Sequence, residues 1–252
     1  MSKLTFADIP RVLKSKILYV VLILTVVMSA ASVFVTVLEM DETASKALIF
    51  PAASNSLVMF MSMMMPVFSG GLSIMLIAAE FSSGIIRNKF IMGHTRAQIL
   101  LSWGIIYTVS TILTYMLYVG IFFISLTAVG ADFTGVDFGK VTVNLLIVLM
   151  FALKFQMFSF LLVCIYPDAK SAVFAYILNN ITIVPLMLAS MSDEKSDAVK
   201  FLSRIFIFGY TNGDYTLMSE PDKPWLTVLL ITVLGAVYYI LAVLYFRKKD
   251  LK

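Results

Sequence analysis

Six long apolar segments limit what this chain can fold into more than any other feature of its sequence. Each has about 20 residues or more, the length that an α-helix needs to cross the hydrocarbon core of a bilayer. In lipid every backbone polar group needs a partner within the chain, which favours helices. The sequence therefore predicts an all-α integral membrane protein with one domain, residues 1–252, and spans at about 17–38, 57–79, 99–128, 141–165, 171–190 and 225–246.

Composition supports the membrane assignment. Soluble domains contain about 25% charged residues, whereas this chain is 60% hydrophobic and 13% charged, with a mean hydropathy of +0.96. These values argue against a soluble enzyme and against a nucleic-acid-binding protein. The single Cys164 permits no intramolecular disulfide, and the single His94 has no second histidine with which to share a metal ion. No metal site is expected.

The distribution of charge predicts the orientation. Six spans place both termini on one side of the membrane, and 12 of the 19 Lys and Arg residues fall on that side. Of the 15 Asp and Glu residues, 11 fall on the opposite side. Because basic residues are retained in cytoplasmic segments, we expect the N- and C-termini to lie in the cytoplasm.

An amphipathic helix is expected before the first span, in the stretch FADIPRVLKSKI. Its apolar residues and its lysines fall on opposite faces: Ile9, Val12 and Leu13 against Lys14 and Lys16. This pattern is typical of a helix lying on the inner membrane surface. Asp8 is a candidate for its N-terminal cap.

A second short helix is expected between the fifth and sixth spans, on the extracellular side, within residues 191–224. One helical face gathers Ala198, Phe201, Leu202, Ile205 and Phe206, and Gly209 would end the helix. Two interpretations remain open: a helix that dips into the outer interface, and an ordinary loop helix resting on the bundle.

Residues 80–96, EFSSGIIRNKFIMGHTR, form a basic stretch between the second and third spans. A continuous helix over residues 81–92 would carry two apolar faces with basic side chains between them. The faces are Phe81, Ile85 and Met92 on one side and Ile86 and Phe90 on the other, with Arg87 and Lys89 between. Two apolar faces predict a partner docked from the cytoplasm; anchoring of helix ends to lipid headgroups is the alternative. Gly93 is expected to end the helix and Thr95 to cap the third span.

The arrangement Glu80-x3-Gly84-x2-Arg87-Asn88, followed by Arg96, resembles the cytoplasmic signature of type-2 ABC exporter permeases. The resemblance implies a coupling helix at about 80–93 that docks on a cytoplasmic ABC ATPase subunit, and a second permease chain, identical or related. It implies a position in the bacterial cytoplasmic membrane. The residues that it assigns to ATPase coupling are Glu80, Phe81, Gly84, Ile85, Ile86, Arg87, Asn88, Lys89, Phe90 and Arg96.

The chain has no nucleotide site of its own in its sequence. The nearest approach to the G-x4-G-K-[ST] phosphate loop is GVDFGKV at residues 135–141, which is one residue short and has Val141 after the lysine. No set of catalytic residues is recognisable, so the chain is not expected to be an enzyme. ATP and Mg²⁺ are therefore expected in the partner ATPase, with no cofactor bound by this chain.

Several polar groups and methionines within the spans are candidates for a translocation path: Lys154, Gln156, Asn179, Asn180, Met63 and Met64. Lys154 lies about 16 Å from the nearer end of its segment at 1.5 Å per residue, and a charge at that depth costs at least about 2.5–3.5 kcal/mol. It should therefore face protein or water. A structural hydrogen bond, with an asparagine of the fifth span for example, is the alternative to a role in transport, and plain helix packing is the alternative for the methionines.

These features predict a permease subunit that exports small peptides, drugs or amphiphiles. Two other classes stay open. One is an ATP-independent channel or carrier with Lys154 in its path. The other is an immunity or sensor protein that binds a toxic peptide at the membrane.

Overall fold

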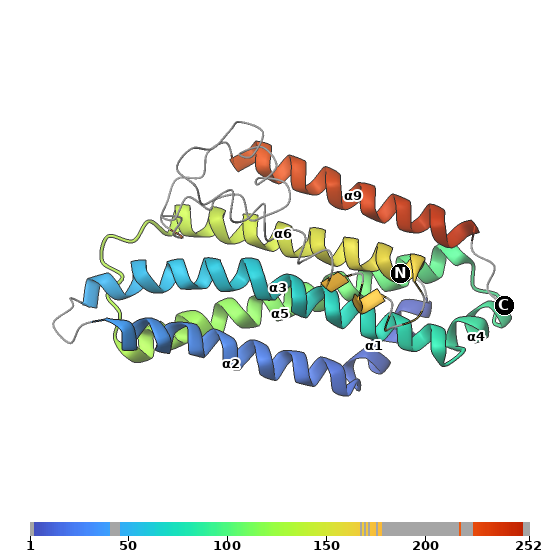
Figure 1. Ribbon diagram of the computed structural model, residues 1–252, viewed down its shortest axis with the longest axis horizontal. Coiled ribbons are helices and arrows are strands. Elements are labelled where there is room, and N and C mark those ends of the chain that lie inside the picture. Colours follow the sequence, from blue (N-terminus) through green and yellow to red (C-terminus); the bar gives the residue numbers. More distant parts are fainter. Residues whose placement is uncertain are drawn as a thin grey trace.

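The fold is a bundle of long helices (Figure 1). The structure is a computed structural model that describes residues 3–40, 46–166, 168, 170, 172–174, 176, 177, 217 and 224–248. Within these residues all regular structure is helical. The helices are α1 (Lys3–Leu13), α2 (Lys16–Glu39), the 3₁₀ turn η1 (Lys46–Leu48), α3 (Ile49–Ser82), α4 (Ile85–Ile91), α5 (Arg96–Val129), α6 (Phe138–Ile165) and α9 (Pro224–Lys248).

The prediction of apolar spanning helices is confirmed in part. Four helices of the described chain, α2, α5, α6 and α9, are long and apolar enough to cross a membrane, and the count rises to five if the bent pair Gly70–Ser82 and Ile85–Ile91 is one span. These helices are compatible with a multi-pass membrane protein. The predicted span at 57–79 lies inside the longer α3. Most of the fifth predicted span, 171–190, and the helix predicted within 191–224 lie outside the described residues.

Helix α6 is the centre of the bundle. It packs against α3 on one side and α9 on the other, and α2 packs on α3 and α5. In its apolar 18-residue stretch, 67% of α6 is buried inside the bundle, compared with 22% of the corresponding stretch of α9. The outer faces of α2 and α9 instead expose large apolar side chains, among them Tyr19, Ile23, Val27, Phe34, Val233, Val237 and Leu244. Such continuous apolar surfaces suit contact with lipid and not with water.

Hydroxyl groups mediate much of the contact between α2 and its neighbours. One buried face of α2 carries Thr25, Ser29, Ser32 and Thr36. Ser29 Oγ donates to the carbonyl of Tyr118 on α5 at 2.7 Å, and Thr36 Oγ1 lies 3.0 Å from Ser56 Oγ on α3. Small and hydroxyl side chains allow close approach of helices where burial of apolar surface gives no advantage over lipid.

A close approach also joins α3 to α6 at Gly70. A Cβ atom at this position would lie 2.4 Å from Ser159 Oγ and 2.5 Å from the Tyr176 hydroxyl, distances that real contacts do not reach. The next residue, Gly71, has no atom within 4 Å of such a Cβ. A side chain larger than hydrogen therefore has space at Gly71 but not at Gly70.

We predict that Gly70→Ala destabilises the protein, by about 1–3 kcal/mol, because the added methyl overpacks the α3–α6 contact. Gly71→Ala is the matched control and should be neutral or slightly stabilising, since alanine favours the helix by about 1 kcal/mol. Thermal unfolding of both variants in the same detergent measures the difference. Equal unfolding temperatures would contradict the close contact at Gly70.

Candidate functional site

The basic stretch does not form the single helix predicted over residues 81–92. Helix α3 ends at Ser82, and Gly84 adopts a left-handed conformation with φ of +71°. Helix α4 then runs at 64° to the last part of α3. The prediction was wrong because a glycine in this conformation reverses the local backbone, and an alanine there would be strained. The predicted end and cap are confirmed: Gly93 has φ of +84°, and Thr95 forms a capping box with Gln98.

The break changes which side chains face inward. Ile86 and Lys89 are each 3% exposed, and Phe81 and Phe90 pack on the same buried cluster as Ile86. The outward side of α4 carries Arg87 and Asn88, together with Ile91 at 74% and Met92 at 67% exposure. The predicted pair of opposite faces is confirmed in part: Ile86 and Phe90 face the bundle together and Met92 is exposed, but Phe81 packs with the first pair and not with Met92. Lys89 is not a surface residue, and the exposed apolar side chains here are Ile91 of α4 and Met92, which follows the helix.

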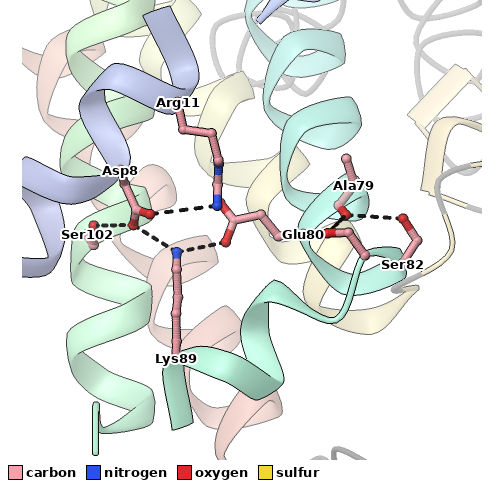
Figure 2. A network of polar contacts seen from close by, with 8 residues as sticks. Asp8, Arg11, Ala79, Glu80, Ser82, Lys89 and Ser102 are labelled. Carbon is pink, nitrogen blue, oxygen red and sulfur yellow. Dashed lines mark hydrogen bonds and ion pairs between the residues drawn. The ribbon is translucent and has the colours of Figure 1, made fainter. Parts of the chain in front are cut away.

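Lys89 belongs to a buried ion cluster that joins four helices (Figure 2). Its Nζ donates to Asp8 Oδ2 of α1 and to Glu80 Oε2 of α3, at 2.8 Å in each case. Ser102 Oγ of α5 donates to the same Asp8 oxygen at 3.0 Å. Arg11 of α1 pairs with Glu80 and lies 3.8 Å from Asp8 Oδ1. Two acids and two bases thus form a neutral cluster.

The cluster is nearly closed to solvent. Asp8 is 4% exposed, Glu80 2% and Lys89 3%, and only Arg11 is partly exposed. Burial lowers the pKa of Lys89 from its ordinary value, and the hydrogen bond to Asp8 acts in the opposite direction. With two carboxylates at hydrogen-bond distance, we expect the ammonium to remain charged at neutral pH. Removing one member would leave an uncompensated charge in a low-dielectric site.

Sequence reasoning missed three members of this cluster. Asp8 was expected to cap α1, but it lies inside that helix and binds Lys89 instead. Arg11 and Ser102 were not singled out. A signal was nevertheless present. Asp8 and Glu80 are acids on the side of the membrane that the charge distribution assigns to basic residues, and a buried acid requires a nearby cation.

Arg96 lies at the same end of the bundle, but it contacts a different helix. Its Nη1 donates to the carbonyl of Phe246 at 3.1 Å and to the carbonyl of Arg247, in the last turn of α9. The last carbonyls of a helix have no partner within the helix, and a cation is favourable at that negative end of the dipole. Arg96 therefore caps α9.

Lys154 faces protein, one of the two surroundings that its depth predicted. It is 4% exposed, and its Nζ lies 4.0 Å from the ring centroid of Phe151 and 4.6 Å from that of Phe155. Gln156 Oε1 accepts a hydrogen bond from Thr108 Oγ1 at 3.4 Å. The prediction for the other path residues is not tested, because Asn179, Asn180 and the side chains of Met63 and Met64 lie outside the described residues.

A groove of about 540 Å³ opens between α5 and α9, with Lys154 of α6 among its lining residues. Gly104 and Thr108 lie on the α5 side, and Gly235 and Tyr239 on the α9 side. The lining is almost entirely apolar. Among the described residues, no group of three His, Cys, Asp or Glu side chains is positioned to hold a metal ion.

Comparison with models of known protein families gives no match, and comparison with curated proteins gives no similar sequence. The site must therefore be interpreted from its own geometry. That geometry consists of a short helix fixed from behind by a buried ion cluster, with a mixed basic and apolar face turned outward.

We predict that Lys89→Met lowers the free energy of unfolding by about 3–5 kcal/mol, because it leaves Asp8 and Glu80 as buried acids with one fewer cation. Arg87→Met is the matched control on the exposed side of the same helix and should change stability by less than about 0.5 kcal/mol. Thermal or chemical unfolding of the purified variants measures both values. The double variant Lys89→Met with Asp8→Asn should recover part of the loss, and a double variant no more stable than Lys89→Met would argue against the Lys89–Asp8 pair.

Proposed function

We propose that this chain is the permease subunit of an ATP-driven exporter, and that a separate cytoplasmic ATPase docks on the outward face of α4. The observation that carries the proposal is the combination at α4. The helix projects at the end of a bundle suited to lipid, and buried ion pairs of Lys89 fix it to α1 and α3. It exposes Arg87 and Ile91, and Met92 directly after it is exposed as well. A short helix that is held firmly on the bundle and exposes one face is suited to receive force from a partner.

The exposed face has the chemistry of a protein contact. Ile91 and Met92 offer large apolar side chains, and Arg87 adds a cation beside them. Binding energy at protein interfaces is concentrated in a few such anchors, with arginine among the most common. A partner groove with an apolar floor and an acidic rim would complement this face.

The proposal that this partner is an ABC ATPase rests on the sequence as well as on the exposed face of α4. The Glu80-x3-Gly84-x2-Arg87-Asn88 arrangement resembles the signature of type-2 ABC exporter permeases. Six spans follow from the apolar segments, cytoplasmic termini from the charge distribution, and a second permease chain from the resemblance alone. The cargo would be a small peptide, a drug or an amphiphile, moved outward across the bacterial cytoplasmic membrane by switching between two states of the assembly.

The buried ion cluster gives α4 a mechanical role in this proposal. Because Lys89 is held by α1 and α3 together, a push on α4 would move those helices with it and would not melt α4 alone. In this proposal the ion cluster holds α4 on the bundle, through Asp8, Arg11, Glu80 and Lys89. The docking face consists of Arg87, Asn88, Ile91 and Met92.

The first experiment locates α4. In a Cys164→Ala background, a cysteine introduced at Met92 should react with a membrane-impermeant thiol reagent only when the cytoplasmic face is accessible, as in inside-out vesicles. Reaction from the external face of intact cells would refute the orientation and with it the docking of a cytoplasmic ATPase.

The second experiment tests docking. We predict that chain purified from its native membranes carries a subunit that hydrolyses ATP, and that Ile91→Asp lowers the captured ATPase activity at least tenfold, equivalent to about 1.4 kcal/mol of binding energy. Phe138→Asp is the matched control, since Phe138 is also exposed but begins α6 at the opposite end of the bundle. Absence of any ATPase, with transport intact, would instead favour a channel or carrier, and peptide binding without transport would favour an immunity protein.

A further inference from the structure

The last turn of α9 is joined to the residues that flank α4 by two kinds of contact. The first is polar. Arg96, which begins α5 directly after the α4–α5 turn, donates to the carbonyls of Phe246 and Arg247. These acceptors are backbone atoms, so the contact depends on the side chain of Arg96 alone.

The second contact is aromatic. The ring of Phe246, which is fully buried, lies 6.1 Å from that of Phe81 at the end of α3 and 5.7 Å from that of Trp103 on α5. Phe81 and Trp103 also contact each other, at 5.9 Å. Aromatic pairs at these separations stabilise by about 0.5–1.5 kcal/mol beyond the area that they bury. Phe246 is thus wedged between the helices on either side of α4.

The same aromatic group contacts the ion cluster. Lys89 Nζ lies 5.7 Å from the Trp103 ring, within the range of a cation–π interaction. A continuous set of contacts therefore runs from Lys89 on α4, through Trp103 on α5, to Phe246 on α9. Nearer the middle of the bundle, the groove of about 540 Å³ is lined by residues of α5, α6 and α9.

We infer that the inner end of α9 and the α4 region form one mechanical unit, and that Arg96 is the positioning residue that joins them. Displacement of α4 then carries the end of α9 with it, and α9, which forms one wall of the groove, changes the groove's width. The inference rests on the proposed function only in taking α4 as the helix that the partner displaces. The connection between α4 and the end of α9 is a property of this chain alone.

Distance measurements on the purified chain in lipid nanodiscs test this connection without any ATPase. In a Cys164→Ala background, spin labels at Met92→Cys and Leu244→Cys report the separation of α4 from α9, because both side chains are exposed. Labels at Met92→Cys and Phe6→Cys report the separation of α4 from α1. We expect Arg96→Ala to broaden the α4–α9 distance distribution at least twofold and to leave the α4–α1 distribution unchanged.

Two further variants make the result specific to Arg96. Arg96→Lys should restore most of the narrow distribution, since an ammonium still reaches a carbonyl at the end of α9. Arg247→Ala removes a neighbouring arginine but keeps the acceptor carbonyl, so it should leave the distribution as it is. An unchanged α4–α9 width in Arg96→Ala would overturn the inference, as would equal broadening of both pairs.

If Arg96→Ala does not purify as a monodisperse protein, Arg96→Met takes its place, because methionine has a similar length but no N–H donor. A distance distribution as narrow as that of the unsubstituted chain would then refute the contact. Because no partner is present, these outcomes do not depend on whether an ATPase docks. Conversely, a failure of the docking experiments leaves the distance measurements fully interpretable.

Discussion

The placement of one ammonium group determines the geometry at the α4 end of the bundle. Lys89 is buried and finds its counter-charges on α1 and α3. Once this side chain points inward, the 100° step of the helix turns the residues two positions before and after it outward. Arg87 and Ile91 are those residues. The buried ion pairs therefore fix not only where α4 lies but also which of its side chains reach solvent.

The sequence was informative where local physics decides the outcome. Long apolar segments without strand periodicity predicted helices, and α2, α5, α6 and α9 begin and end within a few residues of the expected bounds. The cap at Thr95 and the stop at Gly93 depend only on neighbouring residues and were also predicted.

The rest of the site depended on contacts between distant parts of the chain. Asp8 and Lys89 are 81 residues apart, and Arg11 and Glu80 are 69 apart. Helical periodicity cannot show that a lysine between two apolar faces will turn inward to meet such a partner. Nor could it anticipate the left-handed Gly84, which divides one expected helix into two and changes the register of its faces. The burial of Lys154 was predictable because the cost of charge in hydrocarbon allows few alternatives.

The two charged regions at the α4 end should respond differently to ionic strength. The ion cluster is neutral as a whole and all its members except Arg11 are buried, so added salt screens it only weakly. Arg87 is exposed, and its attraction to an acidic partner would weaken as salt is added. High salt should therefore weaken only the part of such a contact that Arg87 contributes, while the helix keeps its place on the bundle. Lowering the salt concentration would restore the attraction of Arg87, and the helix would not have to refold.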